Sequence, residues 1–326
     1  MNAVTPFTDE QARALVNLDQ HYRGWMEDEQ ALAALPYDLR RKRIGGRDYL
    51  YEIVDRGGNG KSQGPWSAEN EAKFADYHRR KTAAKTRRDA SHERVLETAR
   101  LSRALRVPLL AEPVGKILRK ADGRRLLDGT LLVVGTNAMP AYALEAGGFI
   151  GAPDETQDFD MAWAAPSAGE ANEVVWQLLK SVDPTYTVNT ERPFQARNDR
   201  AYEVEVLVAP SRAGTMSKRD KPRPVPLPEQ EWLLLGRSVD RVVACRDGSA
   251  ARIVAPDPRW FALQKLWMSR QAKRNPLKRP KDLKQGTALL DAVRETMPQY
   301  PLDAAFEREL PGELRELYRD WRSAPA

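Results

Sequence analysis

Hydrophobic positions near the start of the chain repeat with the period of an α-helix. Leu15 and Leu18 open this series, and Thr8 followed three residues later by Gln11 is a capping-box pattern that begins helices. We therefore expect a helix over residues 8–35, which ends at the proline that comes next.

Strand-like and polar segments come next. Residues 47–54 and a shorter segment leading to Trp66 read as strands, and residues 55–60 between them have the Gly and Asn content of a hairpin turn. Residues 67–106 are polar, rich in Ala, Lys, Arg and Glu, and free of Gly and Pro, which predicts one or two exposed helices. Residues 1–107 are thus expected to form an N-terminal helical region with a basic β-hairpin at about residues 40–66 and connector helices.

From Pro108 onward, short apolar runs with strand periodicity alternate with helical patterns. Such alternation favours an α/β sheet domain, which we place at residues 108–210. The expected strands are residues 131–134, 158–163 and 202–208, and the expected helices lie around residues 138–145 and 170–180.

The last third of the chain begins with a proline-rich basic loop over residues 211–229. Residues 239–246 and 250–254 flank an Asp-Gly turn and predict a β-hairpin, and the pattern from Pro258 onward is helical. Residues 211–326 are therefore expected to form a loop, a hairpin and a mostly helical C-terminal lobe. The fold class that follows is α/β (α+β), with a mixed sheet core, an N-terminal helical and β-hairpin arm, and this C-terminal lobe.

Positive charge is clustered along the chain. Lys and Arg number 52 against 46 Asp and Glu, so the net charge of +6 is modest, but three basic runs are present. One run alone is typical of a solvated helix face, whereas three runs favour a polyanionic partner such as nucleic acid. The runs are residues 40–43, 79–88 and 273–284.

Several classes of protein are disfavoured by the sequence. Cys245 is the single cysteine, which excludes an internal disulfide and a thiolate metal cluster. The N-terminus lacks the apolar segment of a secretory signal, and no apolar stretch approaches the roughly 20 residues that cross a bilayer. We expect a cytoplasmic protein that does not associate with membranes.

Candidate chemistry centres on acidic residues in the predicted sheet. Asp158 and Asp160 are two positions apart on one expected strand, so both side chains project from the same face and can share hard cations. Glu205, with Glu203 as the alternative, is placed on a neighbouring strand to complete a two-metal site. Mg²⁺, or Mn²⁺, is the cofactor that this ligand set favours.

A second element lies just before these carboxylates. Gly135 ends an apolar strand and is followed by Thr136, Asn137 and a predicted helix, so that backbone N–H groups and a hydroxyl can approach phosphate oxygens. Either element alone occurs often by chance, and the combination in this order carries the prediction.

The combination resembles a known superfamily. A strand followed by Gly-Thr-Asn-Ala and a helix, and then Thr-x-Asp-x-Asp, is similar to the DNA polymerase β-type nucleotidyltransferases, most closely to a bacterial group of nucleotidyltransferase-fold proteins. The resemblance spans about residues 40–290, including the basic hairpin 43–51 and the segment 246–266. It implies a nucleotidyltransferase-type core that uses Mg²⁺ to transfer a nucleoside monophosphate from an NTP to an acceptor hydroxyl.

The resemblance also implies roles for basic residues. Related transferases that act with antitoxin partners pair a helix lysine with a later Lys-x-x-x-Asp element, which corresponds to Lys265 with Lys278, Lys281 and Asp282. Lys265 would neutralise a γ-phosphate, Lys278 would contact the nucleotide, and Asp282 would act in catalysis. From the residues alone, Lys265 could also be an ordinary surface lysine, and Asp282 could pair with Lys278 four residues earlier.

Three functional hypotheses are open at this stage. The first is the transferase, with RNA such as a tRNA end, or a protein hydroxyl, as acceptor and with the basic N-terminal region holding the nucleic acid. The second is a nucleic-acid-binding protein that kept the fold without turnover. It is favoured by Glu at the third carboxylate position and by the 23-residue separation of Gly135 and Asp158. The third is a toxin-type transferase controlled by an antitoxin-like partner.

Overall fold

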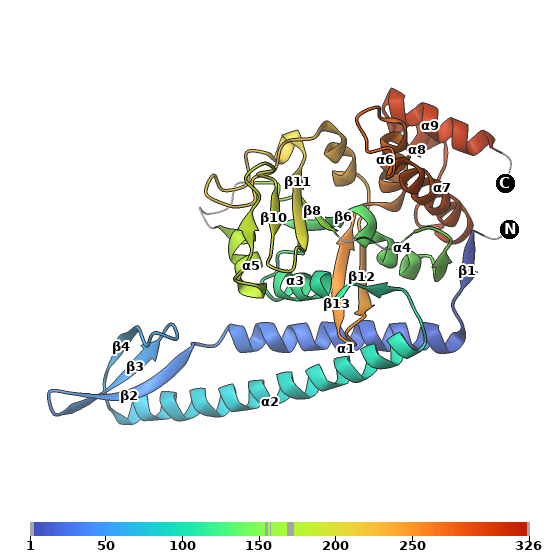
Figure 1. The fold of residues 1–326 in the computed structure, drawn as a ribbon. Coiled ribbons are helices and arrows are strands. Elements are labelled where there is room, and N and C mark those ends of the chain that lie inside the picture. Colours follow the sequence, from blue (N-terminus) through green and yellow to red (C-terminus); the bar gives the residue numbers. More distant parts are fainter. Residues whose placement is uncertain (1–2, 154–155, 157, 168–172, 325–326) are drawn as a thin grey trace. The chain divides into compact units, whose positions relative to one another are not determined.

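The computed structural model describes residues 3–153, 156, 158–167 and 173–324. Helices and strands are intermixed in a mixed α/β fold, as the sequence predicted (Figure 1). None of the described helices has the length and hydropathy required to cross a bilayer.

The chain is divided into two compact units. Residues 108–210 and 211–326, which are separate regions in the sequence prediction, share one hydrophobic core and belong to the same unit. The unit boundaries fall within two long helices. The small unit is Gln20–Thr98, and the large unit is Met1–Asp19 with Ala99–Ala326.

The two long helices each belong in part to both units. The first helix begins at the predicted capping box, because Thr8 N donates to Gln11 Oε1 at 2.9 Å and Gln11 N donates to Thr8 Oγ1 at 3.2 Å. The second is one continuous helix over the polar segment for which the sequence allowed one or two. Their bounds are α1 (Asp9–Ala33) and α2 (Ala68–Ala104).

The described residues of the large unit form three sheets and the remaining helices. Its strands are β1 (Val4–Pro6), β5 (Leu109–Leu110), β6 (Leu131–Val134), β7 (Gly148–Ile150), β8 (Asp158–Trp163), β9 (Thr187–Val188), β10 (Gln195–Arg197), β11 (Glu203–Val208), β12 (Val239–Cys245) and β13 (Ala250–Ala255). Its helices are α3 (Glu112–Gly123), η1 (Gly135–Ala138), α4 (Met139–Glu145), α5 (Val174–Val182), η2 (Pro210–Arg212), η3 (Pro228–Leu234), α6 (Pro258–Arg270), α7 (Arg279–Thr296), α8 (Ala304–Glu309) and α9 (Gly312–Ser323).

The largest sheet has five strands in the order β6-β8-β11-β10-β9. β8 and β11 run parallel, whereas β6 is antiparallel to β8, and β10 is antiparallel to both of its neighbours. Val204, Val206 and Val208 alternate with less buried residues along β11, so one face of the sheet enters the hydrophobic core. The predicted strands at residues 131–134, 158–163 and 202–208 are thereby confirmed.

The predicted hairpin of β12 and β13 is also confirmed, and β5 joins it in parallel to make a three-stranded sheet. Cys245 in β12 is fully buried, as expected for a small core residue. Its Sγ occupies the space that a side chain at Gly115 of α3 would need, so this glycine allows the helix to approach the strand closely.

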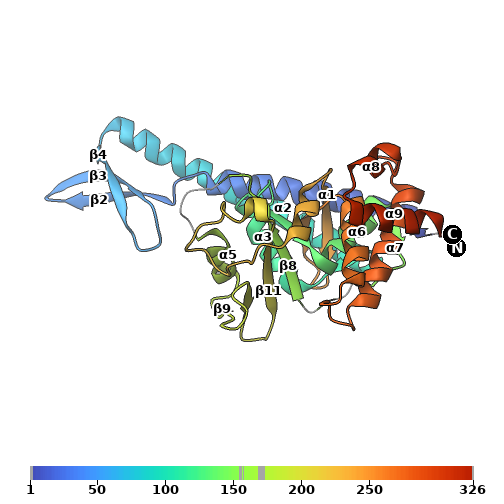
Figure 2. The ribbon, with the colours of Figure 1, turned by 90° about the horizontal axis from the view of Figure 1, so that it is seen from above.

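The C-terminal helices form the predicted helical lobe, and they gather to one side of β8 and β11 in both views (Figures 1 and 2). α6 and α7 pack directly against each other. A Cβ atom at Gly286 of α7 would lie 2.7 Å from the carbonyl oxygen of Ala262 in α6. The glycine therefore permits close contact between α6 and α7, the helices that carry Lys265 and Asp282.

The small unit contains a three-stranded antiparallel sheet in the order β2-β3-β4. The sequence predicted a basic hairpin at about residues 40–66, and its pattern indicated β3 and β4. β2 was indicated only by the basic hairpin 43–51 of the resemblance, because its four consecutive basic residues hide any alternation of apolar and polar positions. The strands are β2 (Asp38–Ile44), β3 (Arg47–Ile53) and β4 (Gly60–Pro65).

Candidate active site

Acidic side chains lie along the paired parts of β8 and β11. In the parallel register, Asp158 is opposite Glu203, and Asp160 is opposite Glu205. Phe159 is buried in the core, while the aspartates on either side of it are only partly buried. The four carboxyl groups therefore belong to one face of the sheet, as the spacing of the two aspartates predicted.

The turn after β6 comes close to the second aspartate. Val134, the last residue of β6, pairs with Asp160 across the antiparallel ladder. Gly135 follows with a φ of +66°, and a Cβ atom at this position would collide with Asp160 Oδ2. Glycine is required by both the backbone conformation and the lack of space, so the turn backbone borders the carboxylate directly.

The next two residues of the turn are buried and tie it to its surroundings. Asn137 Nδ2 donates a 2.8 Å hydrogen bond to the carbonyl oxygen of Asp158, and Gln285 Nε2 of α7 donates to Thr136 Oγ1 at 3.4 Å. Thr136 and Asn137 are 7% and 5% exposed. Both side chains thus hold the turn against β8 and α7.

Burial and mutual repulsion perturb the carboxyl groups. Burial, followed by the charges of Asp158 and Glu205, raises the pKa of Asp160 to about 7. The pKa of Glu205 is raised by burial and then by Asp158. Burial acts in the same direction on Asp158, but a hydrogen bond from Thr156 and the ammonium group of Lys278 hold its pKa below the usual value. Negative charge is therefore concentrated and only partly compensated.

Polar neighbours occupy several of the carboxylate oxygens. Lys278 Nζ lies 3.2 Å from Asp158 Oδ2, and Gln195 Nε2 donates to Glu203 and Glu205 at 3.1 Å each. Among the described residues, no three His, Cys, Asp or Glu side chains are gathered closely enough to hold a metal ion as they stand. Cation binding therefore requires a local rearrangement, and the Lys278 side chain, which is 51% exposed, has room to swing away.

A buried ionic cluster joins α6 to α7. Asp282 is 2% exposed, and its two oxygens lie 3.0 Å from Lys265 Nζ and 2.7 Å from Arg274 Nε. Lys265 is 5% exposed, so the alternative of an ordinary surface lysine is wrong. The alternative pairing of Asp282 with Lys278 is also wrong, because the fold directs Lys278 to Asp158 instead.

A pocket of about 720 Å³ opens beside the carboxylates. Its polar wall brings together groups from the sheet, the glycine turn and the segment between α6 and α7, all of which the sequence separates widely. Of the residues predicted for the site, the lining includes Gly135, Asp160, Glu205, Lys265 and Lys278, and it does not include Thr136, Asn137, Asp158 or Asp282.

The rest of the pocket wall is largely apolar and contains two buried amides. Gln230 and Gln264 are 5% and 3% exposed, and Gln230 Oε1 has no hydrogen-bond partner among the described residues. Flat apolar surfaces with a few polar groups are suited to a nucleoside. The apolar lining residues include Phe194, Leu207, Leu227, Leu233, Trp267 and Met268.

Sequence reasoning missed several of these residues. Arg274 was visible only as one member of the third basic run. Gln195 and Gln230 carry no local signal, because strand pairing brings Gln195 beside Glu205 and the segment before β12 brings Gln230 to the pocket. Gln264 lies on α6 within the segment 246–266 of the resemblance, but it was assigned no role.

Comparison with known proteins identifies the family. Residues 112–311, more than half of the chain, match the protein family described as Nucleotidyltransferase. A solved structure, an antigenic nucleotidyltransferase-like protein from Paracoccidioides brasiliensis, is similar at 16% identity over 65% of this chain and 88% of that chain, with a TM-score of 0.35. No curated protein matches the chain. The family match covers the glycine turn, the acidic strands and the buried ionic cluster, and this chain therefore belongs to the Nucleotidyltransferase family.

Proposed function

We propose that the chain transfers a nucleoside monophosphate from an NTP to an acceptor hydroxyl, with Mg²⁺ or Mn²⁺ as cofactor. The observation that carries this proposal is the register of β8 and β11, which aligns Asp158, Asp160 and Glu205 beside the Gly135 turn. The raised pKa of Asp160 supports the fit of a divalent cation, because burial and two neighbouring carboxylates leave negative charge that such a cation neutralises.

The proposed reaction is an in-line displacement at phosphorus. The acceptor oxygen forms a bond to the α-phosphorus, and the bond from that phosphorus to the oxygen bridging to the β-phosphate breaks. Pyrophosphate leaves, and the hydroxyl proton passes to water. Asp158, Asp160 and Glu205 would hold the divalent ions, which, when bound, would neutralise the phosphate charge and make the acceptor hydroxyl more acidic.

The pocket provides binding and orientation. The triphosphate is assigned to its polar wall, where Gly135 offers its backbone N–H and Lys265 offers a fixed positive charge. The Lys278 ammonium group, which pairs with the Asp158 carboxylate, can turn to a phosphate oxygen when Asp158 binds a cation. The nucleoside is assigned to the apolar wall with its two glutamines.

Labelled nucleotides test this proposal directly. The protein is incubated with labelled ATP, CTP, GTP or UTP in the presence of Mg²⁺ and either total tRNA or a mixture of proteins as acceptor. We expect label to enter the acceptor with the native chain. Incorporation should disappear when Mg²⁺ is chelated, and also in Asp158→Ala, because the carboxylates then hold no cation.

A second candidate is a nucleic-acid-binding protein without turnover. It is favoured by the lack of a preformed three-ligand group among the described residues and by Glu205 in place of an aspartate. Such a protein would bind RNA without metal, in a salt-sensitive manner, and would incorporate no label with any of the four nucleotides.

Stabilisation by Mg²⁺ should depend on pH. Asp160 must release a proton with a pKa of about 7 before it can bind a cation. The Mg²⁺ dissociation constant should therefore fall roughly tenfold for each pH unit from 5 to 7 and level off above that range. Thermal denaturation over a Mg²⁺ titration at each pH measures the dissociation constant. Asp160→Asn serves as the control, because asparagine has no carboxyl proton to release. A constant that does not vary with pH would show that Mg²⁺ binds without Asp160.

A further inference from the structure

The sheet of the small unit has a face that the proposed reaction does not use. In the register of β2 and β3, Arg40 lies opposite Tyr51 and Lys42 lies opposite Tyr49. Directly opposed residues share one face of a sheet, and Arg47 continues the same alternation along β3. These five residues form a surface that we call the tyrosine face.

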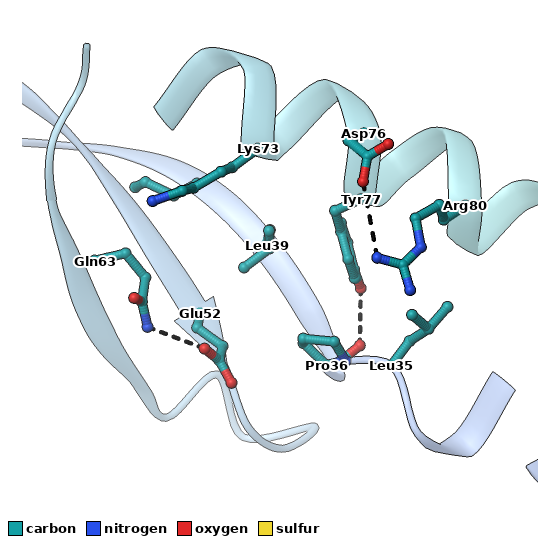
Figure 3. A pocket seen from close by; sticks show the side chains of 10 residues that line it. Leu35, Pro36, Leu39, Glu52, Gln63, Lys73, Asp76, Tyr77 and Arg80 are labelled. Atoms are coloured by element: carbon teal, nitrogen blue, oxygen red, sulfur yellow. Dashed lines mark hydrogen bonds and ion pairs between the residues drawn. The ribbon is translucent and has the colours of Figure 1, made fainter. Parts of the chain in front are cut away.

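The opposite face of this sheet is covered by α2. Leu50 is 1% exposed, and Leu39 lines a pocket together with Tyr77 of the helix (Figure 3). Tyr77 Oη donates a 2.9 Å hydrogen bond to the carbonyl oxygen of Pro36, which fastens the helix next to the start of β2. The alternation of side chains therefore turns the tyrosine face away from this helix.

The tyrosine face is strongly cationic. Five of the eight residues 40–47 are Arg or Lys, and none is acidic. Arg40 pairs with Asp38, although its side chain remains 52% exposed, whereas Lys42 and Arg47 form no ion pair with any residue that the structure describes. Uncompensated positive charge on a solvent-exposed face favours an anionic partner.

Aromatic rings lie among these charges. Tyr49 and Tyr51 are partly exposed, and Lys42 Nζ lies 4.9 Å from the centre of the Tyr51 ring. Rings interleaved with cations can stack unpaired bases while the cations bind the phosphates between them. Bases in a duplex are already stacked on one another, and unpaired bases occur chiefly in the loops and ends of RNA.

We propose that the tyrosine face binds single-stranded RNA. The binding itself requires neither the carboxylates nor an NTP, and only the further role of this RNA as the acceptor rests on the proposed transferase function.

Fluorescence anisotropy of a labelled single-stranded RNA with the full-length chain, without NTP or metal, tests the proposal. Arg40→Gln/Lys42→Gln/Arg47→Gln should weaken binding at least about tenfold and lower the slope of log K against log salt concentration by about 2, since each phosphate contact contributes about 0.7. Tyr49→Leu/Tyr51→Leu should also weaken binding about tenfold or more, whereas Tyr49→Phe/Tyr51→Phe should bind like the native chain, because the rings are kept.

The matched charge control is Lys120→Gln/Arg124→Gln/Lys218→Gln, which removes three exposed cations of the large unit. An equal loss with this control would overturn the proposal, as would duplex RNA binding as tightly as single-stranded RNA. Asp158→Ala should bind RNA like the native chain while it loses transfer. Failure of the transferase function and failure of the RNA site are therefore observed separately.

Discussion

Replacing Asp160 with asparagine should lower the rate of nucleotidyl transfer at least about 1,000-fold. The substitution preserves size but removes the charge placed opposite Glu205 and beside the Gly135 turn. Metal-ion stabilisation of phosphate charge contributes several kcal/mol to such reactions, and each 1.4 kcal/mol corresponds to about a tenfold change in rate. Single-turnover incorporation of labelled nucleotide at saturating NTP and Mg²⁺ measures the effect.

The same substitution should make the metal-free protein more stable. Because the pKa of Asp160 is raised to about 7, well above that of an aspartate in an unfolded chain, the native protein loses stability as pH rises from about 4 to 7. A rise of about three pKa units corresponds to about 4 kcal/mol of lost stability for a fully buried group. Because water partly reaches Asp160, we expect the loss to be about 2 kcal/mol. Urea unfolding in chelator should therefore show a gain of about 2 kcal/mol for Asp160→Asn at pH 8 and little gain at pH 4.

Glu203 provides the matched control for both effects. It shares the sheet face and the hydrogen bond from Gln195, but it does not line the pocket. Glu203→Gln should reduce transfer less than about tenfold, because it removes a carboxylate that is not assigned to the cation. A loss as large as that of Asp160→Asn would make Glu203 the third ligand in place of Glu205. Full activity of Asp160→Asn would exclude Asp160 from the reaction.

The parts of the site that sequence predicted correctly are those set by local geometry. Asp158 and Asp160 share a face because side chains alternate along any strand, and Phe159 between them enters the core. Gly135 could likewise be assigned to a tight turn from its place after an apolar strand, although the collision that excludes a side chain there comes from Asp160 in another strand.

The parts that sequence could not predict depend on contacts between distant segments. Lys265 reads as a surface residue because lysine is rarely buried, and its burial depends on Asp282 of a second helix. The i,i+4 pairing of Lys278 with Asp282 is a sound helix rule, but Lys278 lies at the start of α7, where it can reach Asp158 across the site. β2 could not be predicted from periodicity for a different reason, since its polar residues show no period, and only the resemblance indicated a hairpin there.

Replacing Asp282 with asparagine should lower the stability of the chain strongly. The cationic groups of Lys265 and Arg274 would then lie together in a largely buried site without the carboxylate that neutralises them. Removal of one partner from a buried ionic cluster lowers the free energy of unfolding by about 3–5 kcal/mol, which corresponds to a melting temperature about 4–7 °C lower in a protein of this size. Asp320→Asn is the control, because its ion pair with Arg270 is exposed and should contribute less than about 1 kcal/mol.

Nucleotide should restore part of the stability that Asp282→Asn loses. Lys265 lines the pocket, whereas Asp282 behind it does not, so a bound triphosphate can supply the negative charge that the substitution removes. An NTP should therefore raise the melting temperature of Asp282→Asn more than that of the native chain. This result would identify Asp282 as a residue that positions Lys265 and Arg274. If Asp282 instead contacts the substrate during catalysis, the NTP would stabilise both proteins equally, and the variant would lose transfer at saturating NTP without a matching change in nucleotide affinity.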